Sequence, residues 1–161
     1  MRVAYADPPY PGRHSYYKEG QPVDYGEIFE RLATFDGWAL STSSSSLAEL
    51  LRLIPANVGG KRTTHRVAAW CRTDAAPLPG RTLWMSWEPV IYCAARDPRT
   101  RTRDFLVGSR RGGRKGLIGS KPCDFYTWLF ELVGFRDGDG WEELFPGTGL
   151  GADMAGQRWL L

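Results

Sequence analysis

The sequence lacks several features that would place it in a well-known class of protein. It has no run of 18 apolar residues, so it offers no transmembrane helix, and its first ten residues lack the apolar core of a signal peptide. Its three cysteines, Cys71, Cys93 and Cys123, are odd in number and widely spaced, which predicts neither a disulfide framework nor a CxxC metal site. We therefore expect a protein of the reducing cytoplasm.

Histidine is scarce, and the common catalytic signatures are missing. His14 and His65 have no ligand spacing to each other or to a cysteine, so no metal site is expected. The sequence contains no GxSxG nucleophile motif, no GxxxxGK[ST] phosphate loop and no GxGxxG motif followed by a distant ribose-binding acid. Any catalytic function must therefore rest on other residues.

Apolar residues are plentiful, and charge is unevenly distributed. The 161 residues fit one domain, and 42% hydrophobic with 13% aromatic residues suffice for a core and exclude disorder over most of the chain. The net charge is only +3, but nine lysines and arginines stand against two aspartates between Arg96 and Lys121. This segment predicts either a contact with a polyanion or a solvated loop.

Hydrophobic periodicity predicts strands that alternate with helices. Strands are expected over residues 2–6, 37–42, 66–71, 87–95 and 141–145. Helices are expected after capping boxes at 24–27 and 46–49, from Pro122 to Gly134, and over residues 151–160. The alternation indicates an α/β fold with a mostly parallel sheet of about five strands.

Two of these strands end in loops whose residues suit ligand binding. In Asp7-Pro8-Pro9-Tyr10, a carboxylate and rigid carbonyls can accept hydrogen bonds from an exocyclic amine while the tyrosine ring stacks on a planar base. In residues 143–149, glycines let a ligand approach the backbone, and the helix that follows offers unpaired N–H groups. Taken separately, each loop is equally compatible with a plain turn.

Taken together, ADPPY, GSKP (119–122) and ELFPGTG (143–149) resemble three motifs of the S-adenosylmethionine-dependent DNA amino-methyltransferases, which modify adenine N6 or cytosine N4. Their order resembles the permuted arrangement, in which the catalytic half precedes the cofactor half. WEPVIYCAAR also resembles a strand of the family, so the resemblance covers nearly the whole chain. It implies a Rossmann-like fold shortened from seven strands to about five, with a catalytic half (1–95), a basic recognition segment (96–118) and a cofactor half (119–161).

The resemblance also implies roles for individual residues, with S-adenosylmethionine (SAM) as cofactor, DNA as partner and no metal. The catalytic residues would be Asp7, Pro8, Pro9 and Tyr10. The cofactor would be bound by Asp7, Lys121, Glu143, Phe145, Gly147, Thr148 and Gly149. DNA would be contacted by Arg13, Tyr16, Arg110, Arg111, Arg114 and Lys115, with Trp84 and Trp87 as further candidates near the base. Because DPPY is more typical of adenine-specific members, adenine N6 is the expected target.

The shortened cofactor half leaves other readings open. The chain ends about twelve residues after Gly149, without the later strand whose acid binds the cofactor ribose in the family, and Glu143 stands where an aspartate is usual. A weakly active or inactive relative that binds nucleic acid or serves as a partner subunit is therefore the alternative, and RNA or another amine is a third. The small size suggests a phage or mobile-element enzyme. The apolar residues around an expected edge strand at 141–145 predict a homodimer or a complex with another subunit.

Overall fold

The computed structural model describes residues 1–11, 23–58, 61–62, 64–75, 80, 82–109 and 120–157. Within them the elements follow in the order β1 (Arg2–Ala6), α1 (Tyr25–Leu32), β2 (Gly37–Ser41), α2 (Leu47–Leu53), β3 (Asn57–Val58), β4 (Lys61–Arg62), β5 (Arg66–Arg72), β6 (Trp87–Cys93), β7 (Phe105–Gly108), α3 (Cys123–Val133), β8 (Gly140–Glu143) and α4 (Leu150–Gln157).

The main sheet has six strands in the order β7-β5-β6-β2-β1-β8, and β3 with β4 forms a separate hairpin. β1 runs parallel to both β2 and β8, and β5 runs parallel to β7. β6 is antiparallel to both of its neighbours, β2 and β5. The α/β class is thus confirmed. The expected mostly parallel sheet of about five strands is confirmed in part: three of the five strand pairings are parallel, but the sheet is mixed and has six strands.

Two local causes explain this difference. Among the described residues no helix lies between β5 and β6. Strands joined in this way pair antiparallel, because a parallel pair needs a long crossover. β7 has only four residues and lies inside the arginine-rich segment, where its Phe-Leu-Val core is too short to give a periodic signal. The two-residue strands β3 and β4 were missed for the same reason.

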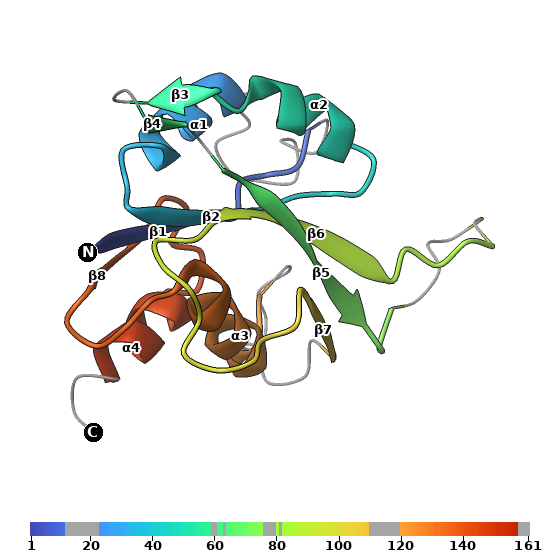
Figure 1. The fold of residues 1–161 in the computed structure, drawn as a ribbon. Coiled ribbons are helices and arrows are strands. Elements are labelled where there is room, and N and C mark those ends of the chain that lie inside the picture. The colour runs from blue at the N-terminus through green and yellow to red at the C-terminus, as the bar shows by residue number, and fades with distance from the viewer. Residues whose placement is uncertain are drawn as a thin grey trace.

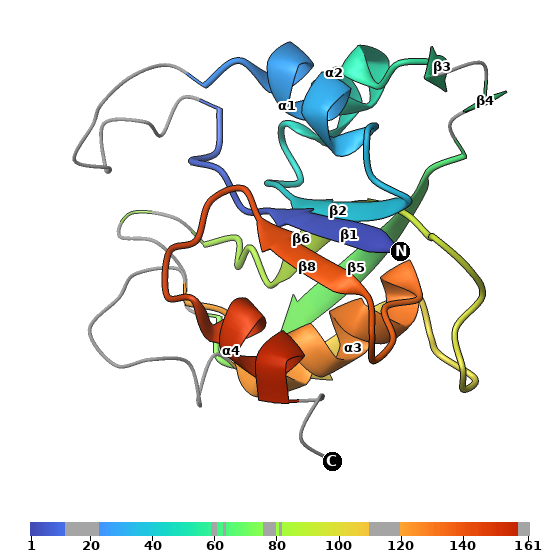
Figure 2. The same cartoon turned by 90° about the vertical axis from the view of Figure 1, so that its left-hand side faces the viewer.

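The sheet is covered by helices on both faces (Figures 1 and 2). α1 and α2 lie on one face, where the buried cluster includes Phe29, Trp38 and Leu40. α3 and α4 lie on the other face, where α3 contributes seven buried residues, among them Phe125 and Phe130. Alternate residues of β1, β2 and β6 belong to the two clusters, as the period-two pattern of a doubly covered sheet requires.

The helix ends follow the expected signals in part. Asp24 caps α1, since its carboxylate accepts hydrogen bonds from the N–H groups of Gly26 and Glu27. Ser46 precedes α2 as expected, but its hydroxyl bonds to that of Ser43 and makes no capping bond, so the second capping box is wrong. α3 ends at Gly134, whose φ of 71° is the left-handed conformation that favours glycine.

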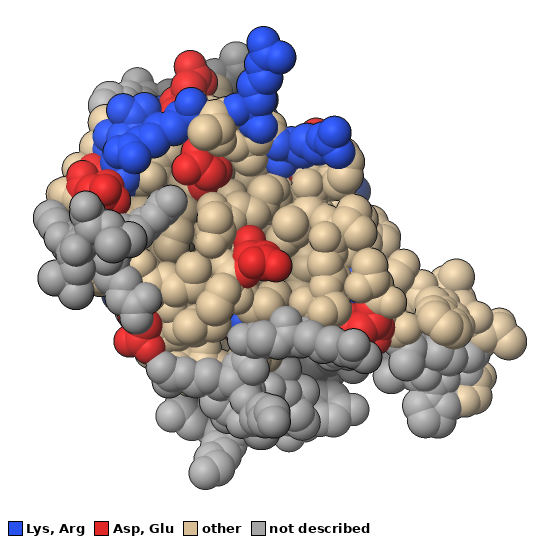
Figure 3. Space-filling view, turned by 90° about the horizontal axis from the view of Figure 1, so that it is seen from below, with Lys and Arg blue, Asp and Glu red and all other residues tan. Residues whose placement is uncertain are grey.

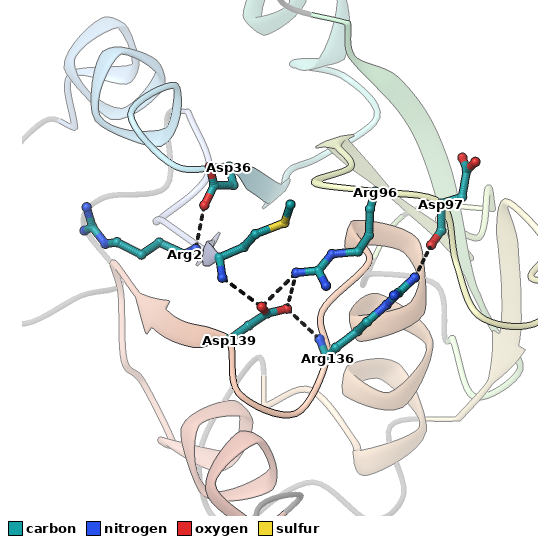
Figure 4. A network of polar contacts seen from close by, with 7 residues as sticks. Arg2, Asp36, Arg96, Asp97, Arg136 and Asp139 are labelled. Atoms are coloured by element: carbon teal, nitrogen blue, oxygen red, sulfur yellow. Dashed lines mark hydrogen bonds and ion pairs between the residues drawn. The ribbon is translucent and has the colours of Figure 1, made fainter.

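A buried carboxylate fixes the amino ends of β1 and β8 (Figure 4). Asp139 accepts hydrogen bonds from the Met1 amino group at 2.9 Å, from Arg96 at 2.7 Å and from the Arg136 N–H at 2.9 Å. Burial alone would raise the pKa of Asp139, but these donors together hold the pKa below its ordinary value. The network therefore sets the register in which the two strands begin.

β8 forms one edge of the sheet, as the sequence predicts, because it pairs only with β1. A helix covers part of the apolar surface near this edge. Trp141, Leu150 and Met154 are partly buried against the α3-side core, since α4 packs on α3 and β8. Trp159, Leu160 and Leu161 lie outside the described residues, and self-association through this edge stays a prediction.

Candidate active site

Several polar side chains meet at one edge of the main sheet, where β1, β2, β5 and β8 end and the antiparallel strand β6 begins. Asp7 follows β1, Glu88 is the second residue of β6, and Lys121 precedes α3. In an open α/β sheet this carboxyl edge is where ligands bind. The topology therefore places acids and a base from three distant parts of the sequence at the expected binding edge.

Lys121 joins the two acids of this edge. Its ammonium lies 2.8 Å from Asp7 Oδ2 and 2.9 Å from Glu88 Oε1. Only 4% of the Lys121 side chain is exposed, against 24% for that of Asp7. A lysine this deeply buried is stable only when it is paired, so the two carboxylates explain its position.

The buried environment shifts the proton affinities of this group. Burial raises the pKa of Asp7, and the nearby Glu88 charge raises it further, although Lys121 opposes both. For Lys121, burial would lower the pKa, but the charges of Asp7 and Glu88 outweigh it and raise the pKa above its ordinary value. Lys121 therefore stays protonated at neutral pH and holds its positive charge against Asp7.

Tyr10 lies against the same group. Burial raises its pKa well above the ordinary value, and the charges of Glu88 and Asp7 add to the rise. The preceding Pro9 is held by α1, since the Tyr25 hydroxyl donates a hydrogen bond of 2.6 Å to the Pro9 carbonyl. This hydrogen bond fixes the Asp7-Pro8-Pro9-Tyr10 loop against α1.

Aromatic rings form the floor beneath the charged group. The Lys121 ammonium lies 5.7 Å from the ring centre of Trp70 and 5.8 Å from that of Phe125. The hydroxyl of the buried Tyr5 shares a hydrogen bond of 2.8 Å with Ser41 Oγ, and either group can be the donor. The ring of Tyr5 packs edge-on against that of Tyr126. These rings exclude water from one side of the site and strengthen the electrostatic interactions above them.

The glycine-rich turn follows β8 at the same edge. Gly149 has a φ of 66°, which glycine adopts without strain, and the Leu150 N–H donates a hydrogen bond of 3.3 Å to the hydroxyl of Thr148 at the start of α4. A side chain at Gly147 or Gly149 would meet no described atom within 4 Å, so both backbones are open to a ligand. Phe145 packs against the α1-side core.

Glu143 lies at the end of β8, between this turn and α3. Its Oε1 atom is buried and makes no hydrogen bond with any described residue. Burial raises the pKa of Glu143, while the neighbouring Trp141 and Tyr126 side chains oppose the rise. Gly151 of α4 packs so closely that a Cβ there would collide with Glu143 and Tyr126. Glu143 is thus a buried acceptor with unused capacity beside the open turn.

The structure brings most of the predicted catalytic and cofactor residues to one edge. Asp7, Tyr10 and Lys121 form one group, and Glu143, Thr148 and Gly149 form the neighbouring turn. The predicted DNA contacts Arg13, Tyr16, Arg110, Arg111, Arg114 and Lys115 all lie outside the described residues. Sequence reasoning missed Glu88, although an acid inside the apolar run WEPVIYC was the available signal.

Among the described residues, no three His, Cys, Asp or Glu side chains are grouped so as to hold a metal ion. No helix in the described ranges has both the length and the apolar character needed to cross a membrane.

Two solved structures resemble the chain in fold. The crystal structure of M1.HpyAVI matches with a TM-score of 0.63 and 9% sequence identity over 99% of this chain and 76% of that one. The crystal structure of the M1.HpyAVI–SAM complex matches with a TM-score of 0.55 and 12% identity over 100% of this chain and 89% of the other. No protein-family model and no curated protein matches the sequence. The structural likeness shows that the chain shares the α/β fold of M1.HpyAVI.

Proposed function

We propose that this protein transfers a methyl group from SAM to an exocyclic base amine in DNA, with adenine N6 as the target. The observation that carries the proposal is the parallel pairing of β1 with β8, in which Tyr5 lies opposite Glu143. This pairing puts the Asp7-Pro8-Pro9-Tyr10 loop and the glycine turn at adjacent strand ends. An amine held by the first loop then faces a methyl donor held by the second.

The residues of the turn fit SAM. Gly147 and Gly149 leave the backbone open, and the amino end of α4, which favours a negatively charged group, follows directly. Glu143 offers a buried carboxylate oxygen without a described partner, which suits the hydroxyl or ammonium donors of the cofactor. The SAM complex of M1.HpyAVI, a protein of similar fold, supports the same choice of cofactor.

Asp7 is the residue that acts on the target amine. When bound, SAM supplies a methyl group on a positively charged sulfur, so the protein must mainly position the attacking nitrogen. A carboxylate has two oxygens and about four acceptor sites, so Asp7 can keep Lys121 on Oδ2 and also accept an N–H of the amine. That bond, with a second one to the Pro8 carbonyl, directs the nitrogen lone pair toward the methyl group.

Lys121 and Tyr10 support this role. The positive charge of Lys121 favours the ionised form of Asp7, which is the form that accepts the amine hydrogen. Tyr10 follows the two prolines and supplies a ring on which a flipped base can stack. The predicted contact between Lys121 and the carboxylate of SAM stays a proposal. In such a contact the SAM carboxylate would share Lys121 with Asp7 and Glu88, which already pair with it.

The charge distribution supports DNA as the partner. The segment between Arg96 and Lys121 is strongly basic in a chain whose other residues are acidic overall. On the face that carries α3 and α4, lysine and arginine side chains gather along one border, and the centre has few charges (Figure 3). A basic segment of this kind suits the phosphates that flank a target nucleotide.

The edge position of β8 favours a second candidate. The sheet stops at β8, so none of the described strands supplies the further acid that holds the cofactor ribose in enzymes of the family that the motifs resemble. A protein with this fold that binds DNA but uses SAM poorly would serve as a partner subunit.

Calorimetry with SAM and a methyl-transfer assay on mixed-sequence DNA separate the two candidates. The enzyme is supported by SAM binding in the micromolar range together with transfer of labelled methyl groups. Binding to DNA without measurable SAM binding or transfer would instead support the partner subunit. RNA of the same sequence serves as the comparison substrate.

A further inference from the structure

Part of the main sheet is apolar but not covered by a helix. On β5, β6 and β7 two rows of residues cross the sheet in register: Trp87, Cys71 and Val107 form one, and Pro89, Ala69 and Phe105 form the next. All six side chains point to the α1–α2 side, because Val67, two residues before Ala69, lies opposite Ile91 of that core. We call these two rows the platform.

Three of the six platform side chains are exposed to solvent, whereas Ala69 and Cys71 are half-buried and Pro89 is buried. Trp87 is 41% exposed, Phe105 42% and Val107 59%. Figure 1 shows the reason: α1 and α2 lie above the left and the centre of the sheet, whereas the end of β5 and the start of β6 extend to the lower right, past both helices. A soluble protein seldom leaves a contiguous apolar area of this kind without a use for it.

Positive charge lies beside the platform. The Arg103 guanidinium lies 5.5 Å from the ring centre of Phe105. β7 itself lies in the middle of the basic segment Arg96–Lys121. A second copy of the chain docked on the same surface would bring arginine against arginine, which opposes self-association. A polyanion with flat apolar groups satisfies both the rings and the guanidinium groups.

The platform also continues into the candidate active site. Trp87 directly precedes Glu88 on β6, and Glu88 turns to the other face, where it meets Lys121 and Asp7. When the target base of a DNA strand enters the site at Asp7, the neighbouring nucleotides of that strand therefore lie beside Trp87.

We propose that the platform binds single-stranded DNA next to the target nucleotide, with bases stacked on Trp87 and Phe105 and a phosphate paired with Arg103. The inference rests on the proposed function for its choice of DNA. Stacking on aromatic side chains and pairing with arginine is how single strands are bound without sequence preference. Neighbouring bases that are held unstacked also lower the cost of flipping the target base.

Fluorescence anisotropy with a labelled single-stranded oligodeoxynucleotide, without SAM, tests the platform apart from catalysis. W87L and F105L keep apolar surface but remove the ring, and each should weaken binding roughly tenfold. R103Q should reduce the slope of log affinity against log salt by about 0.7, the value for one phosphate of a single strand. W87F should retain binding. L53A and R52Q on α2 are the matched controls, and thermal melting confirms that each variant is folded.

The outcomes separate this inference from the proposed function. Wild-type protein that binds the oligonucleotide in a ring-dependent way but transfers no methyl group supports the platform and rejects the proposed function. Methyl transfer to DNA with binding unchanged in both leucine variants overturns the platform and leaves the function standing. Two other outcomes also overturn the proposal for the platform. One is that RNA of the same sequence binds more tightly than DNA and in a ring-dependent way. The other is that the leucine variants lose self-association while their DNA binding is unchanged.

Discussion

Tyr5 of β1 and Glu143 of β8 are registered partners in adjacent parallel strands. The Leu144 N–H continues the pairing with a hydrogen bond of 2.9 Å to the Tyr5 carbonyl, directly before the glycine turn. Because both strands run in the same direction, Asp7 and this turn leave the sheet side by side. Strand pairing, rather than loop conformation, therefore sets their separation, which is the rigidity that a reaction based on positioning needs.

Replacing Asp7 should remove methyl transfer while sparing cofactor binding. D7A deletes the acceptor for the target amine, and the rate should fall by about a hundredfold or more. The fold should persist because Lys121 keeps Glu88 as its partner. Single-turnover assays and SAM calorimetry measure the two effects, with E30Q on the exposed face of α1 as the control. Wild-type turnover in D7A would remove Asp7 from the mechanism.

Replacing Glu88 should change the pH profile. Burial and then the Glu88 charge raise the pKa of Asp7, and transfer needs Asp7 ionised, so activity should fall as pH drops through that raised pKa. E88Q removes one of the two causes, so the acid limb of the profile should move to lower pH. An acid limb that stays in place, in a folded variant, would show that Glu88 does not act on Asp7.

Replacing Glu143 should weaken SAM binding. E143Q loses a charge-assisted acceptor, worth roughly 1.5–3 kcal/mol or about tenfold to a hundredfold in affinity. Because burial raises the pKa of Glu143, the affinity of the wild type should also decrease as pH falls through that raised pKa. E142Q is the control, since Glu142 pairs with Arg31 at the surface. Equal affinity of both variants in calorimetry would exclude Glu143 from the cofactor site.

Asp139 should stabilise the fold in a pH-dependent way. Its pKa is lowered in the folded state, so its contribution is present above the ordinary carboxyl pKa near 4 and disappears as pH falls through the lowered value. D139N should therefore lower the free energy of unfolding by about 2–4 kcal/mol at pH 7. Urea denaturation should show a smaller difference at pH 3, and a difference independent of pH would contradict the assignment.

Gly134 should tolerate no side chain. Its positive φ and the Arg96 carbonyl, which a Cβ would meet, both oppose alanine. G134A should cost roughly 1–3 kcal/mol of unfolding free energy. G156A in α4 is the control, because a Cβ there meets no described atom within 4 Å. Equal melting temperatures for the two variants would show that the end of α3 is not constrained as described.

The elements that the sequence predicted correctly, and the residues that it names as site candidates, are those with a local signal. The runs that became β1, β2 and α3 have the right periodicity, and the motifs name Asp7, Lys121 and Glu143 directly. The antiparallel pairing of β5 with β6 also has a sequence signal, because no helix is predicted between these two strands. The alternation of helices and strands in the rest of the sequence favours a parallel sheet and hides this signal.

The remaining features depend on contacts between distant residues. Lys121 and Asp7 are 114 positions apart, and no spacing rule relates them. Glu88 enters the site because it lies opposite Trp70 in the β5–β6 register, which the sequence does not specify. The platform likewise exists only because β7 pairs with β5, and β7 is too short to be predicted from four residues.

The most direct test of the central claim is to identify the nucleosides in DNA incubated with the protein and SAM that carries an isotopically labelled methyl group. The account predicts labelled N6-methyladenine in the digest with wild-type protein and none with D7A. Label only in cytosine would contradict the proposed target. A digest without label, from folded protein that binds both SAM and DNA, would contradict the proposal that the Asp7 loop and the turn after β8 form a methyl-transfer site.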